Sequence, residues 1–352
     1  MKIAYKIACF FLFAVFFTAC KKDDGGTSYT PPRPYAEVYP EDLAKIEDYL
    51  QNHYVTYNEV DNGDGTKDIT NVVIGKIDTG TPQTPIKDHP LLTFMTVKLH
   101  GLEYKVYYLN LFQGYPEDPA VYNNGGKTPC AVDKILTTYK GMLLDDTVFD
   151  QRPNSVNINL YETILGWQYI FPKFRSGKNT LNSEGVLTHK AYGAGVVFLP
   201  SGLGYYERAV GDITAYSPLV FIFNLNNVTH LDTDLDGVES HFEFNYNADG
   251  TLQDTDGDGI PDYRDIDDDN DGYLTKDEIT HTVTIKNNNG VVQSVNRYVY
   301  PFNGAAANDP ATIYVDDTQG IPDCSGDYAT PTRKRRHLDK NCFTTINLDI
   351  IQ

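Results

Sequence analysis

The stretch ILGWQYIFPKFRSGK, residues 164–178, carries a helical pattern of large apolar side chains. They recur at positions i, i+3, i+4 and i+7, and they are Trp167, Ile170, Phe171 and Phe174. This spacing predicts one apolar stripe along a helix that Gly177 ends. Pro172 lies inside the stripe, so the helix is either kinked or begins later than Gly166.

Strand-like segments rich in β-branched and aromatic residues lie on both sides of this helix. They are EYKVYYLNLFQG (103–114), KILTTYKGMLL (134–144), SVNINLY (155–161), GVVFLP (195–200) and LVFIFNLNNV (219–228). An antiparallel sheet with one short helix laid across it buries the apolar faces of both. The predicted fold class is therefore α+β, with the sheet wrapped on the helix.

Three of these segments resemble, in the same order, the FKBP-type peptidyl-prolyl isomerases. They are TYKGMLLDDTVFDQR (138–152), ILGWQYIFPKFRSGK (164–178) and FLPSGLGYYERAVGDITAYSPLVFIFNLNNV (198–228). Two positions depart from the family pattern. Tyr206 stands where a glycine usually follows the loop tyrosine, and the hairpin LNSEGVLTHKAYGAG (181–195) is less typical. The resemblance implies an FKBP-like domain over residues 101–231.

The resemblance also implies a hydrophobic pocket for proline. By this resemblance Trp167 is the floor, Ile164 offers its backbone amide to the substrate, and Asp150 makes a polar contact beside the pocket. The implied walls are the aromatic side chains of Tyr139, Phe149, Tyr205 and Phe221 and the aliphatic side chains of Val156 and Ile213. Without the resemblance, the same aromatics would be interpreted as ordinary core.

The implied reaction needs no cofactor. Rotation about an Xaa-Pro bond crosses a barrier of ~18–20 kcal/mol, and an apolar pocket accelerates it by binding the twisted imide best. The sequence contains no convincing Ser-His-Asp or Cys-His constellation, which agrees with this chemistry. The expected partners are proline-containing polypeptides. The alternative is a non-catalytic surface binding or adhesion lipoprotein that uses the FKBP-like fold only for recognition.

Three acidic loops of twelve residues follow. Loop A (232–243) reads DTDLDGVESHFE, loop B (254–265) reads DTDGDGIPDYRD and loop C (267–278) reads DDDNDGYLTKDE. Each has carboxylates at positions 1, 3 and 5, glycine at position 6 and a carboxylate at position 12. This pattern is typical of calcium sites, because calcium takes six to eight oxygen ligands and the glycine permits the sharp turn.

The predicted ligands are the residues at positions 1, 3, 5, 7, 9 and 12 of each loop. They are Asp232, Asp234, Asp236, Val238, Ser240 and Glu243 in loop A, Asp254, Asp256, Asp258, Ile260, Asp262 and Asp265 in loop B, and Asp267, Asp269, Asp271, Tyr273, Thr275 and Glu278 in loop C. The loops resemble the calcium-wrapped repeats of thrombospondin type 3 and bacterial surface proteins, which implies structural calcium in a spacer at 232–280.

The alternative for this region is an acidic, solvated linker. Residues 232–278 hold 17 acidic and two basic residues, which leaves −15 of the chain's net charge of −19. Such a segment is costly to fold without counter-ions. The acidic charge also argues against nucleic-acid binding. The one basic cluster, residues 333–336, is expected to be a solvated face, with docking onto the acidic loops as the alternative.

The N-terminus predicts an address in the cell envelope. Residues 1–19 have lysines before an apolar run, as in a secretory signal, and Thr-Ala-Cys ends it at Cys20. This end resembles a bacterial lipoprotein signal, which implies a lipidated Cys20, a flexible tether at 20–36 and a membrane anchor. The KKDDGG that follows resembles the surface-export signal of Bacteroidetes lipoproteins and implies the outer membrane. The alternative is a plain signal peptide with an incidental cysteine.

The remaining segments carry structural predictions only. Residues 37–100 are expected to form an N-terminal α/β region, with one short helix on which Leu43, Ile46 and Leu50 recur. Residues 281–352 are expected to contain a hairpin that turns at Asn289-Gly290 and a segment closed by a disulfide between Cys324 and Cys342. Cys130 is expected to be a buried small hydrophobe.

Overall fold

The computed structural model describes residues 31–78, 80, 82–116, 126–181, 184–247, 250–302, 320–327, 330, 332–343 and 346–351. The chain divides into two units, Met1–Arg33 and Pro34–Gln352, and every element below belongs to the second. The expected signal sequence and Cys20 lie outside the described residues. No helix within the described residues is long and apolar enough to cross a membrane.

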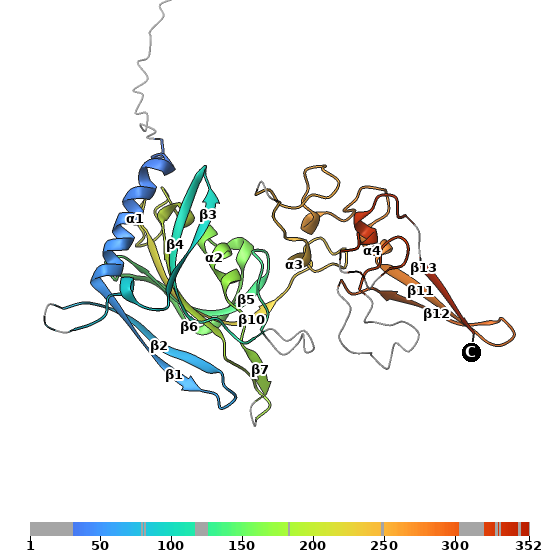
Figure 1. Ribbon diagram of the computed structural model, residues 1–352, viewed down its shortest axis with the longest axis horizontal. Helices are drawn as coiled ribbons and strands as arrows, with labels where there is room; N and C mark the ends of the chain where they lie inside the picture. Colours follow the sequence, from blue (N-terminus) through green and yellow to red (C-terminus); the bar gives the residue numbers. More distant parts are fainter. Residues whose placement is uncertain are drawn as a thin grey trace, which may run out of the picture. The chain divides into compact units, whose positions relative to one another are not determined.

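A six-stranded sheet organises the part of the chain that resembles an isomerase (Figure 1). Every pair of neighbouring strands in it is antiparallel. In spatial order the strands are β3 (Leu92–Leu99), β4 (Leu102–Phe112), β9 (Gly193–Leu199), β10 (Leu219–Thr229), β5 (Lys134–Leu143) and β6 (Val148–Asn159). With the short helices packed on this sheet, the fold is α+β, which confirms the predicted class.

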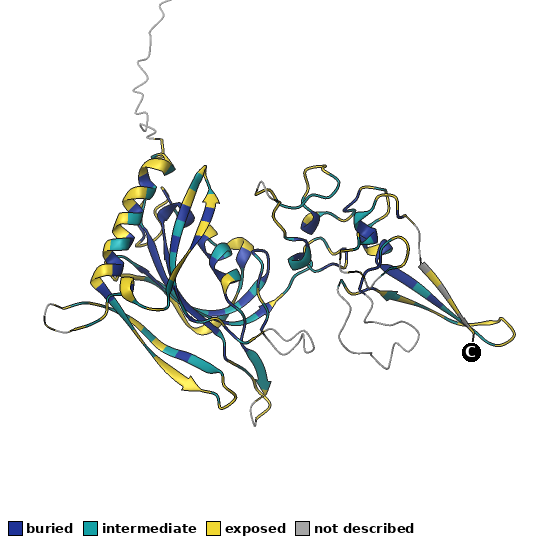
Figure 2. Ribbon diagram, viewed as in Figure 1, coloured by how far each residue is buried: buried dark blue, intermediate teal, exposed yellow. Residues whose placement is uncertain are grey.

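The helix α2 (Leu165–Ile170) packs on one face of this sheet and is shorter than its apolar stripe predicts. It continues as one 3-10 turn, η4 (Phe171–Lys173), and does not run to Gly177 as expected. Pro172 explains the change, because it has no amide hydrogen to extend the α-helical ladder. The stripe is nevertheless buried as a whole, and the residues in it are Trp167, Ile170, Phe171 and Phe174 (Figure 2).

The helix α1 (Tyr35–Asn52) covers the other face of the sheet. Alternate residues of β9 separate the two faces: Val197 belongs to the cluster around α2, whereas Val196 belongs to the cluster with Ile46 of α1. The helix begins inside the predicted tether and contains Pro40. The expected boundary between residues 100 and 101 is also wrong, because it separates β3 from its hydrogen-bonded partner β4.

Smaller elements surround the main sheet. β1 (His53–Asp61) and β2 (Lys67–Lys76) form a hairpin that turns through DNGDG at 61–65. β7 (Lys178–Leu181) pairs with β8 (Leu187–Lys190) in a second hairpin. Three 3-10 turns complete this part: η1 (Ile86–Asp88), η3 (Leu160–Glu162) and η5 (Ser201–Leu203).

The acidic loops end in single turns of helix rather than in the long helices of EF-hands. These turns are α3 (Ser240–Glu243), η6 (Asp262–Arg264) and α4 (Thr275–Glu278). A three-stranded sheet follows, of β11 (Thr280–Lys286), β12 (Val292–Val299) and β13 (Ile346–Ile351). The β11-β12 hairpin turns at Gly290 as predicted, whereas β13, which pairs in parallel with β11, is not predicted by the sequence.

Candidate functional site

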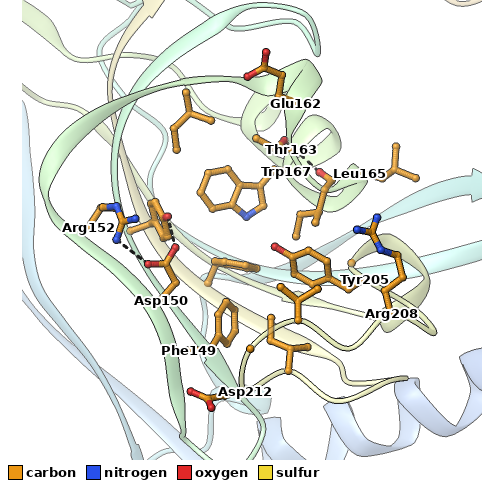
Figure 3. A pocket seen from close by; sticks show the side chains of 18 residues that line it. Phe149, Asp150, Arg152, Glu162, Thr163, Leu165, Trp167, Tyr205, Arg208 and Asp212 are labelled. Carbon is orange, nitrogen blue, oxygen red and sulfur yellow. Dashed lines mark hydrogen bonds and ion pairs between the residues drawn. The ribbon is translucent and has the colours of Figure 1, made fainter.

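A pocket of about 910 Å³ opens between β5, β6, the start of α2 and the loop before β10 (Figure 3). Eight of the nine residues predicted for the proline site line it: Tyr139, Phe149, Asp150, Ile164, Trp167, Tyr205, Ile213 and Phe221. These residues come from five separate segments of the chain. The sheet and helix therefore bring them together, as the family resemblance implies.

Val156 is the exception, and its predicted role is corrected. It lies in β6 opposite Thr137 and does not line the pocket, whereas Ile158, two residues further on, does. The pairing of β5 with β6 shifts register between Thr137 and Tyr139, so β6 has two extra residues there and bulges. The sequence pattern predicts the strand but not the bulge. The predicted aliphatic wall residue, Val156, therefore lies two positions before the residue that lines the pocket, Ile158.

The indole of Trp167 forms the floor and lies in the centre of the lining side chains (Figure 3). It is 5% exposed, and two pocket aromatics meet it edge-on: Tyr139 at a ring-centroid distance of 4.9 Å and Phe221 at 5.2 Å. Its buried Nε1–H donates to no described residue. The floor therefore offers an apolar face to a ligand.

Gly141 of β5 lets two pocket rings approach the backbone closely. A Cβ at this position would lie 2.5 Å from Cζ of Phe149 and 2.9 Å from Cε1 of Phe221. The two rings meet edge-on across it, with centroids 5.6 Å apart. The absence of a side chain at Gly141 thus sets the width of the pocket on this side.

The polar rim consists of three linked side chains. The hydroxyl of Tyr139 donates to Oδ2 of Asp150 at 2.6 Å, and Nη1 of Arg152 donates to Oδ1 of the same carboxylate at 2.8 Å (Figure 3). Burial, and then the hydrogen bond to Asp150, raises the pKa of Tyr139 to about 12. Tyr139 therefore stays a neutral donor at physiological pH and fixes Asp150 at the edge of the apolar site.

The pocket loop (residues 204–213) carries half of the lining residues that the sequence did not identify. Arg208, Val210 and Asp212 lie in it, between the predicted wall residues Tyr205 and Ile213. Val210 and Ile213 exchange backbone hydrogen bonds of 2.9 Å, which turns Ile213 back into the pocket. These residues could have been predicted from the sequence, because they lie between two expected wall residues in the same loop.

The surroundings of Tyr206 show how a tyrosine fits at the position where the resemblance leads one to expect glycine. Its φ of 54° is in the left-handed region that glycine adopts easily. The Tyr206 ring stacks on Tyr35 of α1 at 4.0 Å and meets Tyr216 edge-on at 5.1 Å. Helix α1 thus buries the side chain that the strained backbone presents, directly beside the pocket wall Tyr205.

The acidic loops repeat one hydrogen-bonding scheme. The acid at position 1 accepts from the backbone amide of the position-6 glycine, in the pairs Asp232–Gly237 (3.1 Å), Asp254–Gly259 (3.0 Å) and Asp267–Gly272 (3.2 Å). All three glycines have φ between 91° and 100°. The acid at position 5 accepts from the amide at position 7 in every loop. One loop geometry therefore occurs three times.

The carboxylates at positions 1, 3 and 5 cluster in each loop, with one oxygen atom of each within 4.8 Å of the others. At positions 1, 3, 5 and 12, loop C has six buried carboxylate oxygens that accept no hydrogen bond from a described residue, on Asp267, Asp269, Asp271 and Glu278. Loop A has four, on Asp234, Asp236 and Glu243, and loop B has only one, on Asp256. Such oxygens are unfavourable unless a cation or a proton joins them.

The pKa values of the closing acids show the same crowding. Burial, and then Asp236 and Asp268, raises the pKa of Glu243 to about 11. Burial, and then the carboxylates of Asp269 and Asp271, raises the pKa of Glu278 to about 9. The all-oxygen donor set of loops A and C fits calcium. In loop B the closing acid Asp265 instead accepts the amide of Asp267 at 3.0 Å.

The residues predicted as ligands at position 9 make hydrogen bonds across their own loops. Oγ of Ser240 and Oγ1 of Thr275 each accept the backbone amide of the residue seven positions earlier, at 3.0 and 3.2 Å. Both oxygens of Asp262 are occupied in the same way, by Thr255 and Gln253. These hydrogen bonds hold each loop closed. The predicted carbonyl ligands Val238, Ile260 and Tyr273 follow the position-5 acids in the same turns.

The remaining predicted positions lie in the C-terminal part and the core. Cys324 and Cys342 are joined by a disulfide with their Cα atoms 5.3 Å apart. Cys130 is a free cysteine, and burial raises the pKa of its thiol. The basic cluster is not a solvated face throughout, because Arg336 is 2% exposed and its charge interacts with Glu278 of loop C.

Comparisons with known proteins match parts of the chain. A family model described as BamM C-terminal matches residues 226–314, which contain the acidic loops and the β11-β12 hairpin. Separately, 100 residues are 33% identical to the "Probable FKBP-type peptidyl-prolyl cis-trans isomerase FkpA" of Neisseria meningitidis serogroup B. That match covers 27% of this chain and 31% of the relative, so the chain spans about a third of the relative's length.

Solved structures of isomerases give weaker likenesses. A peptidyl-prolyl cis-trans isomerase from Pseudomonas syringae pv. tomato is 16% identical, with 57% of this chain and 99% of that chain covered and a TM-score of 0.32. FkpA from Escherichia coli is 23% identical, with 36% and 48% covered and a TM-score of 0.27. The chain is thus similar in part to FKBP-type isomerases.

Proposed function

We propose that the domain around the six-stranded sheet is a peptidyl-prolyl cis-trans isomerase of the FKBP type that acts on proline-containing polypeptides. The observation that carries the proposal is the aromatic pocket, in which Trp167 lies under Tyr139 and Phe221 with eight family positions in place. The partial identity to an FKBP-type relative supports it. The pocket is wide enough for a proline ring and its flanking residues.

In this proposal the pocket acts by shape and desolvation. The proline ring packs on the Trp167 indole between aromatic walls, where water no longer donates to the imide carbonyl and favours its planar form. The amide of Ile164, which precedes α2, donates to the bound peptide backbone. Interactions that are stronger for the twisted imide than for either planar isomer lower the barrier to rotation.

The polar rim orients the peptide and takes no part in proton transfer. Asp150, held by Tyr139 and Arg152, lies where it can accept from a peptide amide or face the twisted carbonyl's dipole. Among the described residues, no histidine or cysteine lines the pocket. A mechanism without general acid–base catalysis therefore agrees with the lining residues.

A refolding assay tests the proposal. The client is a protein whose slow refolding phase is limited by an Xaa-Pro bond, a step of tens to hundreds of seconds. Catalytic amounts of the purified full chain should accelerate this phase, and Phe149→Ala should lose most of the effect. Phe94→Ala is the matched control, because Phe94 is 54% exposed on β3 and lies outside the pocket.

The outcomes separate isomerase from recognition module. Acceleration that Phe149→Ala abolishes and Phe94→Ala preserves supports the enzyme. A folded chain that binds the client without accelerating it would leave a non-catalytic binding protein. A chain that neither binds nor accelerates would reduce the resemblance to one of fold alone.

We propose further that the acidic loops bind about three calcium ions as structure. The repeated glycine turns and the unpartnered oxygens of loops A and C support this, since bound cations offset the repulsion among clustered carboxylates. Chelation should lower the melting temperature and expose residues 232–278 to proteolysis. Metal analysis that finds no calcium, together with no response to chelator, would contradict the proposal.

The proposed location is the cell envelope, with a lipid on Cys20 as the anchor and the outer membrane as its site. The signal-like N-terminus supports this address, as do the matches to an FKBP-type FkpA and to the BamM C-terminal family. Cells grown with a labelled palmitate analogue should label the chain, and Cys20→Ser should lose the label. Labelling that persists in Cys20→Ser would contradict the anchor.

A further inference from the structure

Asp268 is an acidic residue that the calcium pattern leaves without a role. It occupies position 2 of loop C, where side chains of such loops point away from the loop's own ion. Its carboxylate lies instead beside loop A, with one oxygen within 4.8 Å of oxygens of Asp236 and Glu243. The three residues belong to two different loops and form a cluster separate from the Asp267-Asp269-Asp271 cluster of loop C.

This cluster is buried, and most of its carboxylate oxygens accept no hydrogen bond from a described residue. Asp268 and Asp236 are each 1% exposed, and Glu243 is 4% exposed. Both oxygens of Asp268, both oxygens of Glu243 and Oδ2 of Asp236 accept no hydrogen bond from any described residue. The Asp268 backbone amide is held by Thr275 at 3.2 Å, so the residue is fixed in place while its carboxylate stays unpartnered.

Asp268 completes an oxygen set that loop A lacks by itself. Loop A has four unpartnered buried oxygens, and the two of Asp268 bring the number to six. Loop C reaches six with its residues at positions 1, 3, 5 and 12, without Asp268. Six oxygens are the minimum that calcium usually takes, so loops A and C present equal donor sets only when Asp268 is counted with loop A.

We propose that Asp268 is a ligand of the calcium ion in loop A, supplied from loop C. This inference rests on the proposed calcium binding and adds a ligand and a coupling to it. The shared ion ties loop A to loop C across the intervening loop B. Calcium in loop A therefore fixes the start of loop C.

Asp268→Asn tests the proposal because it should be stabilising in chelator and harmful to ion binding in calcium. In chelator, it removes one of three buried like charges and should raise the melting temperature of the full chain. In calcium, it weakens a ligand, and the affinity of one ion should fall at least about tenfold, since ligand charge tunes affinity in such sites. Asp277→Asn is the matched control, because Asp277 pairs with Arg297 at the surface and should change neither quantity.

A double-mutant cycle assigns the ion. Asp268→Asn and Glu243→Gln should weaken the same ion, so their effects should not add, whereas Asp268→Asn and Glu278→Gln should add. Native mass spectrometry counts the ions, and calorimetric titration with calcium chloride gives their affinities. These readouts are independent of isomerase activity.

Four results would overturn the inference. Calcium affinity unchanged in Asp268→Asn would remove Asp268 from the site. Non-additivity with Glu278→Gln would assign Asp268 to loop C, and loss of a fourth ion would make the cluster a separate site. A wild-type chain that binds no calcium would overturn the calcium proposal and this inference together, whereas normal wild-type binding with an unaffected variant would overturn the role of Asp268 alone.

Discussion

At the residue scale, the shape of the pocket depends on one glycine in β5. The Phe149 and Phe221 rings lie against the backbone of Gly141, where any side chain would meet them within 2.9 Å. A methyl group there can be accommodated only if the rings move into the pocket. The residue that sets the width of the site is thus one that never contacts a ligand through a side chain.

Gly141→Ala should therefore impair ligand binding. Overpacking of this kind destabilises a protein by about 1–3 kcal/mol. It also reduces the volume left for the proline ring. Trp167 is the only tryptophan in the chain, so its fluorescence reports binding of an Xaa-Pro peptide directly. Lys140→Ala, one position earlier on the same strand, is the control and should bind normally. Equal peptide affinity in the two variants would show that the rings do not define the pocket.

Tyr139→Phe should reduce activity without unfolding the domain. It removes the 2.6 Å hydrogen bond to Asp150, which is worth about 1 kcal/mol in stability, and leaves the carboxylate held only by Arg152. Because the pKa of Tyr139 is raised to about 12, the hydroxyl keeps its proton and the wild-type rate should be nearly constant between about pH 6 and 8. A rate that changes tenfold over this interval would indicate a titrating catalytic group.

At the element scale, helix α1 supports the pocket from behind. Oδ2 of Asp42, which is fully buried in the helix, accepts from the backbone amide of Ser201 at 2.8 Å and from its hydroxyl at 2.6 Å. Ser201 begins the η5 turn that leads into the pocket loop. Together with the stack of Tyr35 on Tyr206, this contact fixes the position of Tyr205.

Asp42→Ala should accordingly raise the KM for a proline peptide more than it lowers kcat. It leaves two buried donors of Ser201 without an acceptor, at a cost of about 1–3 kcal/mol in stability. Asp42→Asn keeps an acceptor oxygen and should restore the wild-type KM. Unchanged KM in Asp42→Ala, with the domain folded, would show that the loop holds its position without α1.

The stability contributed by Asp42 should also depend on pH. Burial raises the pKa of this carboxyl, although the bonds from Ser201 act against the shift. The folded state therefore binds the proton more readily, so the contribution is present below the unfolded value of ~3.9 and is lost as the pH rises through the folded pKa. In denaturant unfolding, the free energy of unfolding of Asp42→Asn should increase relative to that of the wild type as the pH rises from about 4 to 7. A difference that stays constant with pH would contradict this.

Elements with strong local patterns could be predicted, and their exact extents could not. The alternation in β9 and β10 and the stripe around Trp167 identify strands and helix, because burial on one face dictates them. The end of α2 at Ile170 and the bulge that replaces Val156 with Ile158 depend on Pro172 and on strand pairing. The role of α1 is equally invisible in sequence, since Asp42 and Ser201 are 159 residues apart.

At the scale of the whole molecule, none of the described residues that line the pocket belongs to an acidic loop. The pocket lining ends at Phe221, and the first loop begins at Asp232 after β10. Chelation should therefore lower the thermal stability of residues 232–278 while the isomerase rate stays within about twofold, as expected for independent sites. Parallel loss of activity and calcium would instead show that the loops are part of the catalytic unit.

The exchange rate of an Xaa-Pro peptide tests the central claim most directly. Nuclear magnetic resonance can follow cis–trans exchange of such a peptide with catalytic amounts of the purified full chain, in calcium and in chelator. The account predicts strong acceleration in both buffers, with most of it lost in Phe149→Ala and in Asp150→Ala although both variants remain folded. A folded wild-type chain that leaves the exchange rate at its uncatalysed value would contradict it.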